Sequence, residues 1–129
     1  MGQDLVDGPG ADFIVFENAF VNTGGPVWAE PGLVEASLDG QAWSAFPCDS
    51  VTFPYAGCAG NTPTQAPGPD GNLDPRDPSV AGGNAFDLNT VGLARARFIR
   101  ITDVSTDDTG GTTAGFDLDA VAIVRHGSP

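Results

Sequence analysis

Carboxylates stand at the ends of the most apolar stretches of this chain. They occur in Asp12-Phe-Ile-Val-Phe-Glu17, in Ala29-Glu30-Pro31 and in Phe116-Asp117-Leu-Asp119-Ala-Val-Ala-Ile-Val124. A carboxylate beside a buried strand must be solvated, protonated, paired with a base or bound to a metal, because an uncompensated buried charge is costly. The chain has 17 acidic residues, five arginines and no lysine. Internal ion pairs therefore cannot neutralise most of the acids.

Calcium is the cation that suits such a set, since Ca2+ takes about six to eight oxygen ligands. We expect a Ca2+ site built from Asp12, Glu17, Glu30, Asp117 and Asp119, together with backbone carbonyls. Asp117 and Asp119 share a face of a strand, whereas Asp12 and Glu17 point to opposite faces. One ion therefore cannot take all five without a bend, and the alternative is that some of them are solvated residues that cap turns.

A second group of possible metal ligands follows in the middle of the chain. It consists of Asp70, Asn72, Asp74 and Asp77. The first three are spaced like the start of a calcium loop, but the group lacks the bidentate glutamate that closes such a loop. A plain turn of aspartate and proline accounts for these residues equally well.

The two cysteines, Cys48 and Cys58, predict a disulfide. They lie in a segment rich in proline and glycine and lack the CxxC spacing of a zinc or redox site. A disulfide implies an oxidising compartment, so we expect a secreted or cell-surface protein. The first residues have neither the basic start nor the apolar stretch of a signal peptide, so we expect an excised domain or the mature part of a longer precursor.

Composition predicts an all-β protein with one domain over residues 1–129. The chain has 18 glycines, 11 prolines and eight phenylalanines, and apolar residues do not recur at a helical period. The net charge of −12 at pH 7 disfavours nucleic acid and anionic membrane surfaces as partners. Membrane insertion is not expected either.

Two stretches are apolar on both sides and therefore predict interior strands of a covered sheet. In residues 12–17, Ile14 and Phe16 share one face while Phe13 and Val15 share the other, and residues 118–124 are similar. Residues 33–38 alternate, and Asp39-Gly40 predicts a tight hairpin turn into residues 43–46. Residues 97–102 predict a further strand, whose facing the sequence leaves open.

Residues 47–84 are rich in proline, glycine, asparagine and aspartate and show little periodicity. Loops of this length are uncommon in compact domains unless they are functional or disordered. The predicted disulfide favours order. We expect this loop to cover the outer face of one sheet, with Phe53 and Tyr55 as its anchors.

The chain also resembles a family of bacterial cell-surface protein domains over nearly its whole length. The residues that carry the resemblance are Asp7-Gly-Pro-Gly10, Asp12-Phe-Ile-Val-Phe-Glu-Asn-Ala-Phe20, Glu30-Pro31, Ser37-Leu-Asp-Gly40, Phe46-Pro-Cys48, Gly57-Cys-Ala-Gly60, Asp74-Pro-Arg-Asp77, Ala81-Gly-Gly83, Phe86-Asp-Leu88, Val91-Gly-Leu93 and Gly115-Phe-Asp-Leu-Asp-Ala-Val121. The resemblance implies a secreted location more strongly than an activity.

A looser resemblance suggests the architecture. The hairpin at residues 37–43, followed by Ala96-Arg-Phe-Ile-Arg-Ile101, is similar to discoidin and galactose-binding-like jelly rolls. It implies a jelly-roll-like β-sandwich with a long disulfide-stapled loop. Many members of that group hold a structural Ca2+ and bind glycans at loop tips.

One departure from the surface family concerns the start of the chain. Family members carry further strand sequence upstream of the Asp-Gly-Pro-Gly motif, whereas only six residues precede Asp7 here. We therefore expect either that a neighbouring subunit supplies the first strand or that the chain is trimmed. An edge left open in this way would recruit other chains.

Three aromatic residues could stack on a sugar ring: Trp28, Trp43 and Tyr55. Trp43 follows the predicted hairpin turn, and we expect it in the core, while the position of Trp28 stays open. Three arginines, at positions 95, 97 and 100, could bind an anion, but we expect them to pair with the surrounding acids.

Catalysis is not expected. His126 is the sole histidine and lies close to the C-terminus, and both cysteines are predicted to pair with each other. The sequence therefore favours an extracellular, calcium-binding adhesion or binding module whose partner is a glycan or a surface protein. The alternatives are a structural subunit of an assembly or fibre that pairs through an open strand edge and, less favoured, a glycan-processing enzyme with a carboxylate pair.

Overall fold

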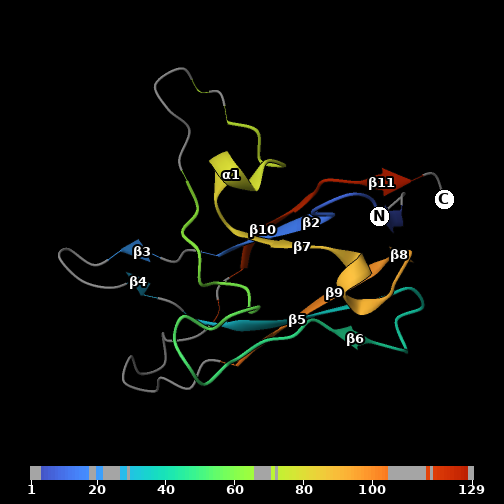
Figure 1. The fold of residues 1–129 in the computed structure, drawn as a ribbon, viewed down its shortest axis with the longest axis horizontal. Helices are drawn as coiled ribbons and strands as arrows, with labels where there is room; N and C mark the ends of the chain where they lie inside the picture. Colours follow the sequence, from blue (N-terminus) through green and yellow to red (C-terminus); the bar gives the residue numbers. More distant parts are fainter. Residues whose placement is uncertain are drawn as a thin grey trace.

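The computed structural model describes residues 4–17, 20–21, 27–28, 30–65, 71, 73–104, 116 and 118–127. The described chain consists mainly of short antiparallel strands with few helical turns (Figure 1), which confirms the all-β prediction at that level. In chain order the elements are β1 (Asp4–Val6), β2 (Phe13–Glu17), β3 (Phe20–Val21), β4 (Val27–Trp28), β5 (Gly32–Ser37), β6 (Ser44–Ala45), α1 (Pro78–Ala81), β7 (Asn84–Phe86), the 3-10 helix η1 (Leu88–Val91), β8 (Arg95–Ala96), β9 (Phe98–Asp103), β10 (Leu118–Ile123) and β11 (His126–Gly127).

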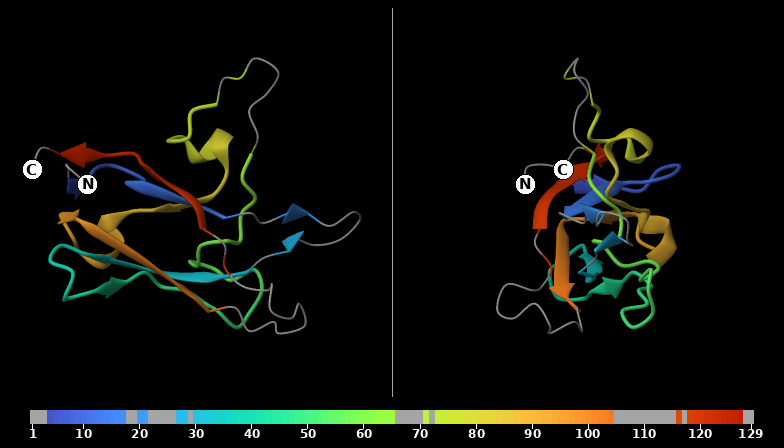
Figure 2. Two further views of the ribbon diagram at one scale, coloured as in Figure 1. Left: turned by 180° about the vertical axis from the view of Figure 1, so that it is seen from behind. Right: turned by 90° about the vertical axis from the view of Figure 1, so that its left-hand side faces the viewer.

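Two three-stranded sheets form separate layers, which Figure 2 shows from behind and from one end. One sheet has the order β10-β2-β7 and the other the order β6-β5-β9. The pairing of β5 with β9 is regular from Gly32 opposite Asp103 to Ser37 opposite Phe98. A third sheet, β11-β1-β8, and the pair β3-β4 complete the described strands.

The main core lies between the two layers. Its buried members are Leu5, Phe13, Val15, Val34, Ala36, Phe46, Ala59, Phe86, Leu88 and Ala96. The ring of Phe13 stacks on that of Phe86 with 5.2 Å between the centroids. Phe46 meets both rings edge to face, at 5.8 Å from Phe13 and 5.0 Å from Phe86. These three rings join both sheets.

Strand β2 confirms the prediction of an interior strand that is apolar on both sides. Phe13 and Val15 face the main core, whereas Ile14 and Phe16 belong to a second buried cluster with Ala81. The same prediction is wrong for β10, which pairs only with β2 among the described strands. Its Leu118 is 52% exposed. An apolar run alone does not distinguish an edge strand from a central one.

The segment 47–84 is ordered over its described residues and covers the outer face of β2. The predicted disulfide between Cys48 and Cys58 is present. An antiparallel bridge joins Gly32 to Ala59, and from the same segment Leu73 and Ala81 pack in the cluster of Ile14 and Phe16. These contacts place described parts of the segment against the outer face of β2, as the prediction expects.

The predicted anchors of that loop are wrong. Phe53 is 51% exposed, and its ring packs edge to face on the half-buried Tyr55 at 5.8 Å. Both lie on the turn between the two cysteines, and neither belongs to a buried cluster. Small buried residues, Ala59 and Ala81, make the anchoring contacts instead.

The hairpin between β5 and β6 is present, with Glu35 opposite Ala45 and Ala36 opposite Ser44. Its turn is longer than the predicted tight turn, because β5 ends at Ser37. The Asp39 Oδ1 accepts hydrogen bonds from the backbone N–H groups of Gln41 and Ala42, at 2.8 and 2.9 Å. These bonds keep the pKa of Asp39 below its ordinary value.

A strand precedes the Asp7-Gly-Pro-Gly10 turn. Strand β1 lies between β11 and β8, with Leu5 opposite both His126 and Ala96. The sequence did not predict this strand because it is only three residues long. Residues 4–6 thus contribute a strand to the fold, and a further strand supplied by a partner stays a prediction.

Candidate functional site

Among the described residues, the strand-end acids do not gather into one site. Asp12 and Glu17 lie at opposite ends of β2, which separates them by roughly 17 Å at 3.4 Å per residue. Both are buried, Glu30 is half-buried, and Asp119 is exposed on β10. Asp117 lies outside the described residues. A single ion therefore cannot bind both ends of β2.

Asp12 is fully buried and holds three segments together. Its Oδ1 accepts a hydrogen bond from the Gly8 N–H at 3.0 Å, and its Oδ2 accepts one from the Leu88 N–H at 2.8 Å. The Nε of Arg125 lies 3.6 Å from Oδ1, and the guanidinium also donates to the Pro9 carbonyl. The carboxylate thus joins the turn before β2, the start of η1 and the chain after β10.

Two further acids, Asp7 and Asp87, surround Asp12. One carboxylate oxygen of each lies within 4.8 Å of the others. Burial raises the pKa of Asp12, and the charges of Asp7 and Asp87 raise it further, while the Leu88 and Gly8 N–H groups oppose the shift. Asp7 is exposed, whereas Asp87 is half-buried and accepts from the Asn89 N–H at the start of η1. Sequence reasoning missed both residues.

In the second predicted group, the described acids Asp74 and Asp77 accept hydrogen bonds within local turns. Asp74 accepts from the backbone N–H and the Nε of Arg76, which lowers the pKa of Asp74. Asp77 caps α1 by accepting from the Ser79 N–H at 2.9 Å and from its hydroxyl at 2.6 Å. Asp70 and Asn72 lie outside the described residues. For Asp74 and Asp77, a plain turn of aspartate and proline, the alternative to a calcium loop, therefore fits.

All five arginines of the chain contact an acid, as expected for the three that the sequence singled out. Arg95 and Arg97 both bind Asp4, at 3.0 and 2.7 Å. The remaining pairs are Arg100 with Glu35, Arg76 with Asp74, and Arg125 with Asp12. No arginine is therefore left over as an anion-binding side chain.

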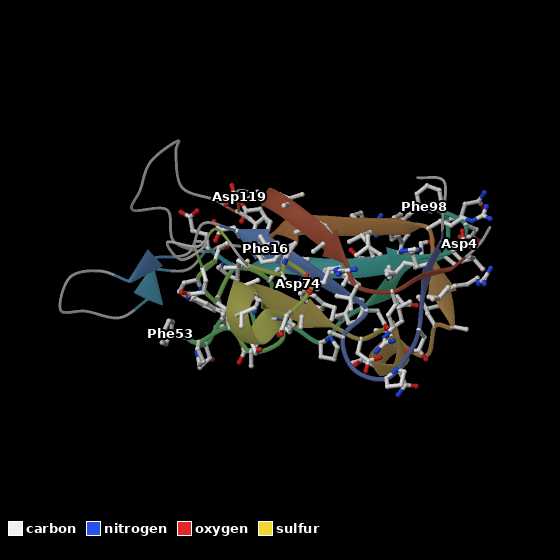
Figure 3. The ribbon with its side chains drawn as sticks, turned by 90° about the horizontal axis from the view of Figure 1, so that it is seen from above. Asp4, Phe16, Phe53, Asp74, Phe98 and Asp119 are labelled. Carbon is white, nitrogen blue, oxygen red and sulfur yellow. A yellow bond between two sulfur atoms is a disulfide. The ribbon has the colours of Figure 1, made fainter. Side chains whose placement is uncertain are left out.

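The outer face of the β6-β5-β9 sheet is exposed to solvent. Val34 and Ala36 of β5 point into the core, so their neighbours along the strand point outward. On β9, the residues that share the outward side are Phe98, Arg100 and Thr102, and all three are exposed. Phe98 is 46% exposed and is labelled in Figure 3. In contrast to this face, the outer face of β2 is covered by segment 47–84.

Trp43 lies on this exposed face, so its predicted core position is wrong. The guanidinium carbon of Arg100 is 4.0 Å from the centre of a Trp43 ring, and the Phe98 ring meets the indole edge to face at 6.5 Å. Arg100 also donates to both carboxylate oxygens of Glu35, at 2.7 and 3.2 Å. We call Trp43, Phe98, Arg100 and Glu35 the aromatic platform. Phe46 occupies the inward position on this segment.

The other two predicted sugar-stacking residues are not part of the platform. Tyr55 is half-buried in the turn between the cysteines, beside Phe53. The backbone of Trp28 pairs with Phe20 in the β3-β4 hairpin, but its side chain lies outside the described part of the structure.

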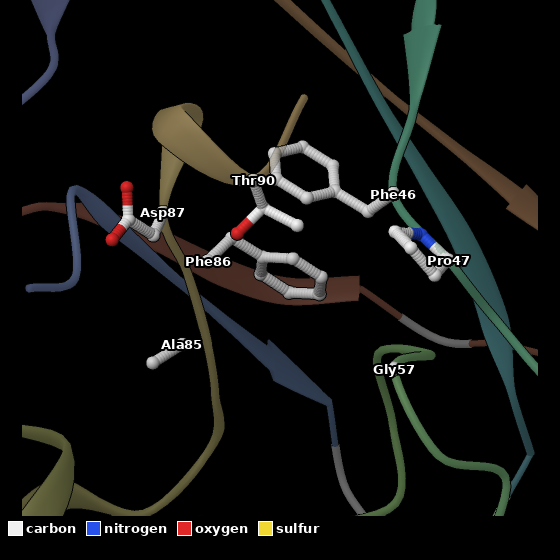
Figure 4. Close-up of a pocket in the computed structure, with 7 residues that line it drawn as sticks. All are labelled: Phe46, Pro47, Gly57, Ala85, Phe86, Asp87 and Thr90. Atoms are coloured by element: carbon white, nitrogen blue, oxygen red, sulfur yellow. The ribbon is translucent and has the colours of Figure 1, made fainter. Parts of the chain in front are cut away.

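A hollow of about 280 Å³ opens beside η1 (Figure 4). Its lining consists of Phe46, Pro47, Gly57, Ala85, Phe86, Asp87 and Thr90. The two phenyl rings are almost fully buried, so the hollow exposes mainly ring edges. The Asp87 carboxylate points away from the rings (Figure 4).

No family model, curated protein or solved structure matches the chain. The resemblances noted from the sequence therefore stay predictions. None of the described helices is long and apolar enough to cross a membrane.

Proposed function

We propose that the protein is an extracellular binding module, secreted or held at the cell surface, that binds a neutral glycan on the aromatic platform. The carrying observation is an indole and a phenyl ring in edge-to-face contact on an exposed sheet face, next to a bidentate ion pair. Adhesion to a surface glycan is the biological role that this site would serve.

The chemistry of the platform suits a sugar. Aromatic rings offer apolar contact to the C–H groups of a pyranose, and the indole N–H adds a polar edge. Arg100 and Glu35 neutralise each other and can exchange hydrogen bonds with hydroxyl groups. The net charge of −12 repels acidic polysaccharides. A neutral glycan therefore fits better than an anionic one.

We propose that the protein binds the glycan without hydrolysing it. The platform holds one carboxylate, that of Glu35, and the Arg100 guanidinium binds both of its oxygens, whereas glycoside hydrolysis uses a pair of carboxyl groups. For the fold we propose a jelly-roll-like β-sandwich, supported by the two layers around one core and the covered face of β2.

We also propose that the protein binds Ca2+ at Asp7, Asp12 and Asp87. Three carboxylates within 4.8 Å of one another repel, and Arg125 supplies only one positive charge. Asp12 already accepts two backbone hydrogen bonds, so Asp7 and Asp87 would supply the main protein ligands. Backbone carbonyls and water would complete the coordination.

Glycan binding is tested by affinity electrophoresis of the wild type and Trp43→Ala through gels that contain neutral polysaccharides, with an acidic polysaccharide as comparison. Retardation by a neutral glycan that Trp43→Ala abolishes supports the proposal. Equal retardation of both proteins would place the ligand elsewhere, and retardation by the acidic polymer alone would overturn the assignment of ligand class.

A further inference from the structure

The outward side of β9 carries a row of exposed side chains: Phe98, Arg100 and Thr102. Ile99 and Ile101, which alternate with them, pack against the main core. Phe98 and Thr102 are four residues apart, which separates them by roughly 14 Å at 3.4 Å per residue. A sugar ring is little larger than a phenyl ring, so a single sugar cannot reach both ends of this row.

The two rings of the aromatic platform are inclined to each other. The planes of the Trp43 indole and the Phe98 phenyl ring make an angle of 64°, and their centroids are 6.5 Å apart. A pyranose presents its C–H groups to the face of an aromatic ring when the two rings lie parallel, and no single ring lies parallel to two planes inclined by 64°. Contact with both faces therefore takes two sugar units whose ring planes are themselves inclined.

Neutral glycans differ in the inclination of neighbouring units. In cellulose-type chains, successive rings lie in nearly one plane, and the chain is a flat ribbon. In starch-type chains, each linkage bends the chain, so that neighbouring ring planes are inclined and the chain curves. The curved chain fits the inclined rings of Trp43 and Phe98 better than the flat ribbon does.

Polar side chains continue the row beyond the two rings. Arg100 binds Glu35 through Nε and one terminal nitrogen, which leaves the other terminal nitrogen to donate to the hydroxyl groups of a sugar. The hydroxyl group of Thr102 can both donate and accept. A chain that lies over Trp43 and Phe98 and then follows β9 reaches Thr102 only with a further sugar unit.

We propose that the aromatic platform and Thr102 together bind an internal stretch of a neutral, curved, linear glycan of the starch type. This inference rests on the proposed function and specifies the length and the shape of the ligand. Trp43 and Phe98 contact neighbouring sugar units, Arg100 binds their hydroxyl groups, and Thr102 binds a unit farther along β9. Because the row lies on an exposed sheet face, the chain continues past both of its ends.

The test is isothermal titration of the full chain with two series of glucose oligomers, each from the disaccharide to the hexasaccharide. The malto-oligosaccharides are curved and the cello-oligosaccharides are flat, while sugar and charge are the same in both. We expect the affinity to rise about tenfold between maltose and maltohexaose. Each cello-oligosaccharide should bind about tenfold more weakly than the malto-oligosaccharide of the same length.

Two threonine variants separate the contribution of the row from that of the rings. Thr102→Val removes one hydroxyl group, and it should weaken binding of maltohexaose roughly fivefold while binding of maltose stays unchanged. Valine suits a strand, so the fold should be retained. Thr90→Val is the matched control, because Thr90 is also exposed but lies on η1. It should bind both sugars like the wild type.

The results distinguish failure of this inference from failure of the proposed function. Equal affinity for maltose and maltohexaose, with no effect of Thr102→Val on either, would overturn the role of the row while glycan binding at Trp43 stands. Tighter binding of the cello-oligosaccharides, or binding of a different neutral glycan alone, would overturn the assignment of a curved chain. If no neutral polysaccharide retards the protein in the electrophoresis, the proposed function fails and this inference fails with it.

Discussion

The guanidinium of Arg100 lies 4.0 Å from the centre of a Trp43 ring while the same group binds both carboxylate oxygens of Glu35. The register of β5 with β9 places Glu35 directly opposite Arg100. Cross-strand pairing therefore fixes the guanidinium, and the guanidinium helps to fix the indole. A binding residue that is positioned by a sheet loses little conformational freedom when its ligand arrives.

The first prediction concerns Trp43. Replacing it with alanine should weaken binding of a neutral glycan roughly tenfold or more, which corresponds to about 1.4 kcal/mol. Thermal unfolding should change little, because the indole is only half-buried and lies outside the main core. The measurement is isothermal titration with the oligosaccharide that the electrophoresis identifies.

Phe53→Ala is the control for this variant, since Phe53 is an exposed aromatic residue at 51% on a different part of the surface. It should bind the glycan like the wild type. If Phe53→Ala weakens binding and Trp43→Ala does not, the ligand lies on the turn between the cysteines, and the platform is not the site.

The second prediction concerns calcium. Addition of Ca2+ after EGTA treatment should raise the unfolding temperature, because a ligand that binds only the native state stabilises it, by about 2.7 kcal/mol at a hundredfold excess over Kd. Mg2+ at the same concentration should have less effect. The double variant Asp7→Asn/Asp87→Asn should lose the calcium response.

Asp74→Asn is the comparison variant for this experiment, because Asp74 is an acid that binds only within its own turn. It should keep the response of the wild type. The calcium proposal would be refuted if the unfolding temperature does not respond to Ca2+ and elemental analysis finds no metal in the protein. Arg125 would then be the cation that Asp12 contacts at this cluster.

Strands β2 and β10 show best which parts of the fold the sequence could predict. Both are apolar on successive residues, and the pattern correctly identified β2 as a central strand. It failed for β10, because local sequence does not state how many neighbours a strand will have. The hairpin of β5 and β6 was predicted correctly, but its longer turn depends on the side chain of Asp39.

The candidate sites were harder to predict than the fold. Asp12 was singled out because it precedes an apolar strand, yet its neighbours Asp7 and Asp87 become visible only when η1 packs beside the turn before β2. Trp43 was expected inside because it follows the predicted hairpin turn and precedes Phe46, a position that suits cross-strand packing. The indole faces outward because Phe46 takes the inward position on the same segment. The sequence did not establish which of these two aromatic residues faces the core.

The third prediction concerns the stability that Asp12 provides. Asp12→Ala leaves the N–H groups of Gly8 and Leu88 without their acceptor, and each unsatisfied buried donor costs about 1–3 kcal/mol. We expect a loss of about 2–4 kcal/mol in the free energy of unfolding, measured with urea. Asp119→Ala, at an exposed position, should change it by less than about 0.5 kcal/mol.

The fourth prediction is a dependence on pH that Asp12 causes. Its pKa is raised above the ordinary value of 3.8, so the folded state holds this proton more tightly than the unfolded state. The contribution to stability is therefore lost as pH rises above 3.8. Asp39, Asp49 and Asp74 have lowered pKa values and act in the opposite direction, since their contribution is lost as pH falls.

Asp12→Asn separates these effects because it removes one titration and leaves the other three. In metal-free buffer, the free energy of unfolding of the wild type should fall relative to that of Asp12→Asn as pH increases through and above 3.8. Parallel curves for the two proteins would mean that the pKa of Asp12 is not raised by burial and by its acidic neighbours.

The fifth prediction concerns the close approach of the chain beside the disulfide. Gly57 has a φ of +83°, and a Cβ at this position would lie 1.9 Å from the Pro47 carbonyl oxygen. Gly92 has a similar φ of +73°, but a Cβ there would meet nothing within 4 Å. Both alanine variants incur the cost of left-handed backbone, about 1–2 kcal/mol. Only Gly57→Ala also collides with backbone, which cannot rotate away as a side chain can.

We therefore expect Gly57→Ala to be less stable than Gly92→Ala by more than about 1 kcal/mol, within the range of overpacking costs. The comparison is made by urea unfolding with the Cys48–Cys58 bond intact, which thiol titration of the unfolded proteins verifies. Since both variants share the same backbone penalty, their difference measures the collision alone. Equal stability would show that the chain between the cysteines can move away from Pro47, and that the disulfide does not require the tight approach of Gly57.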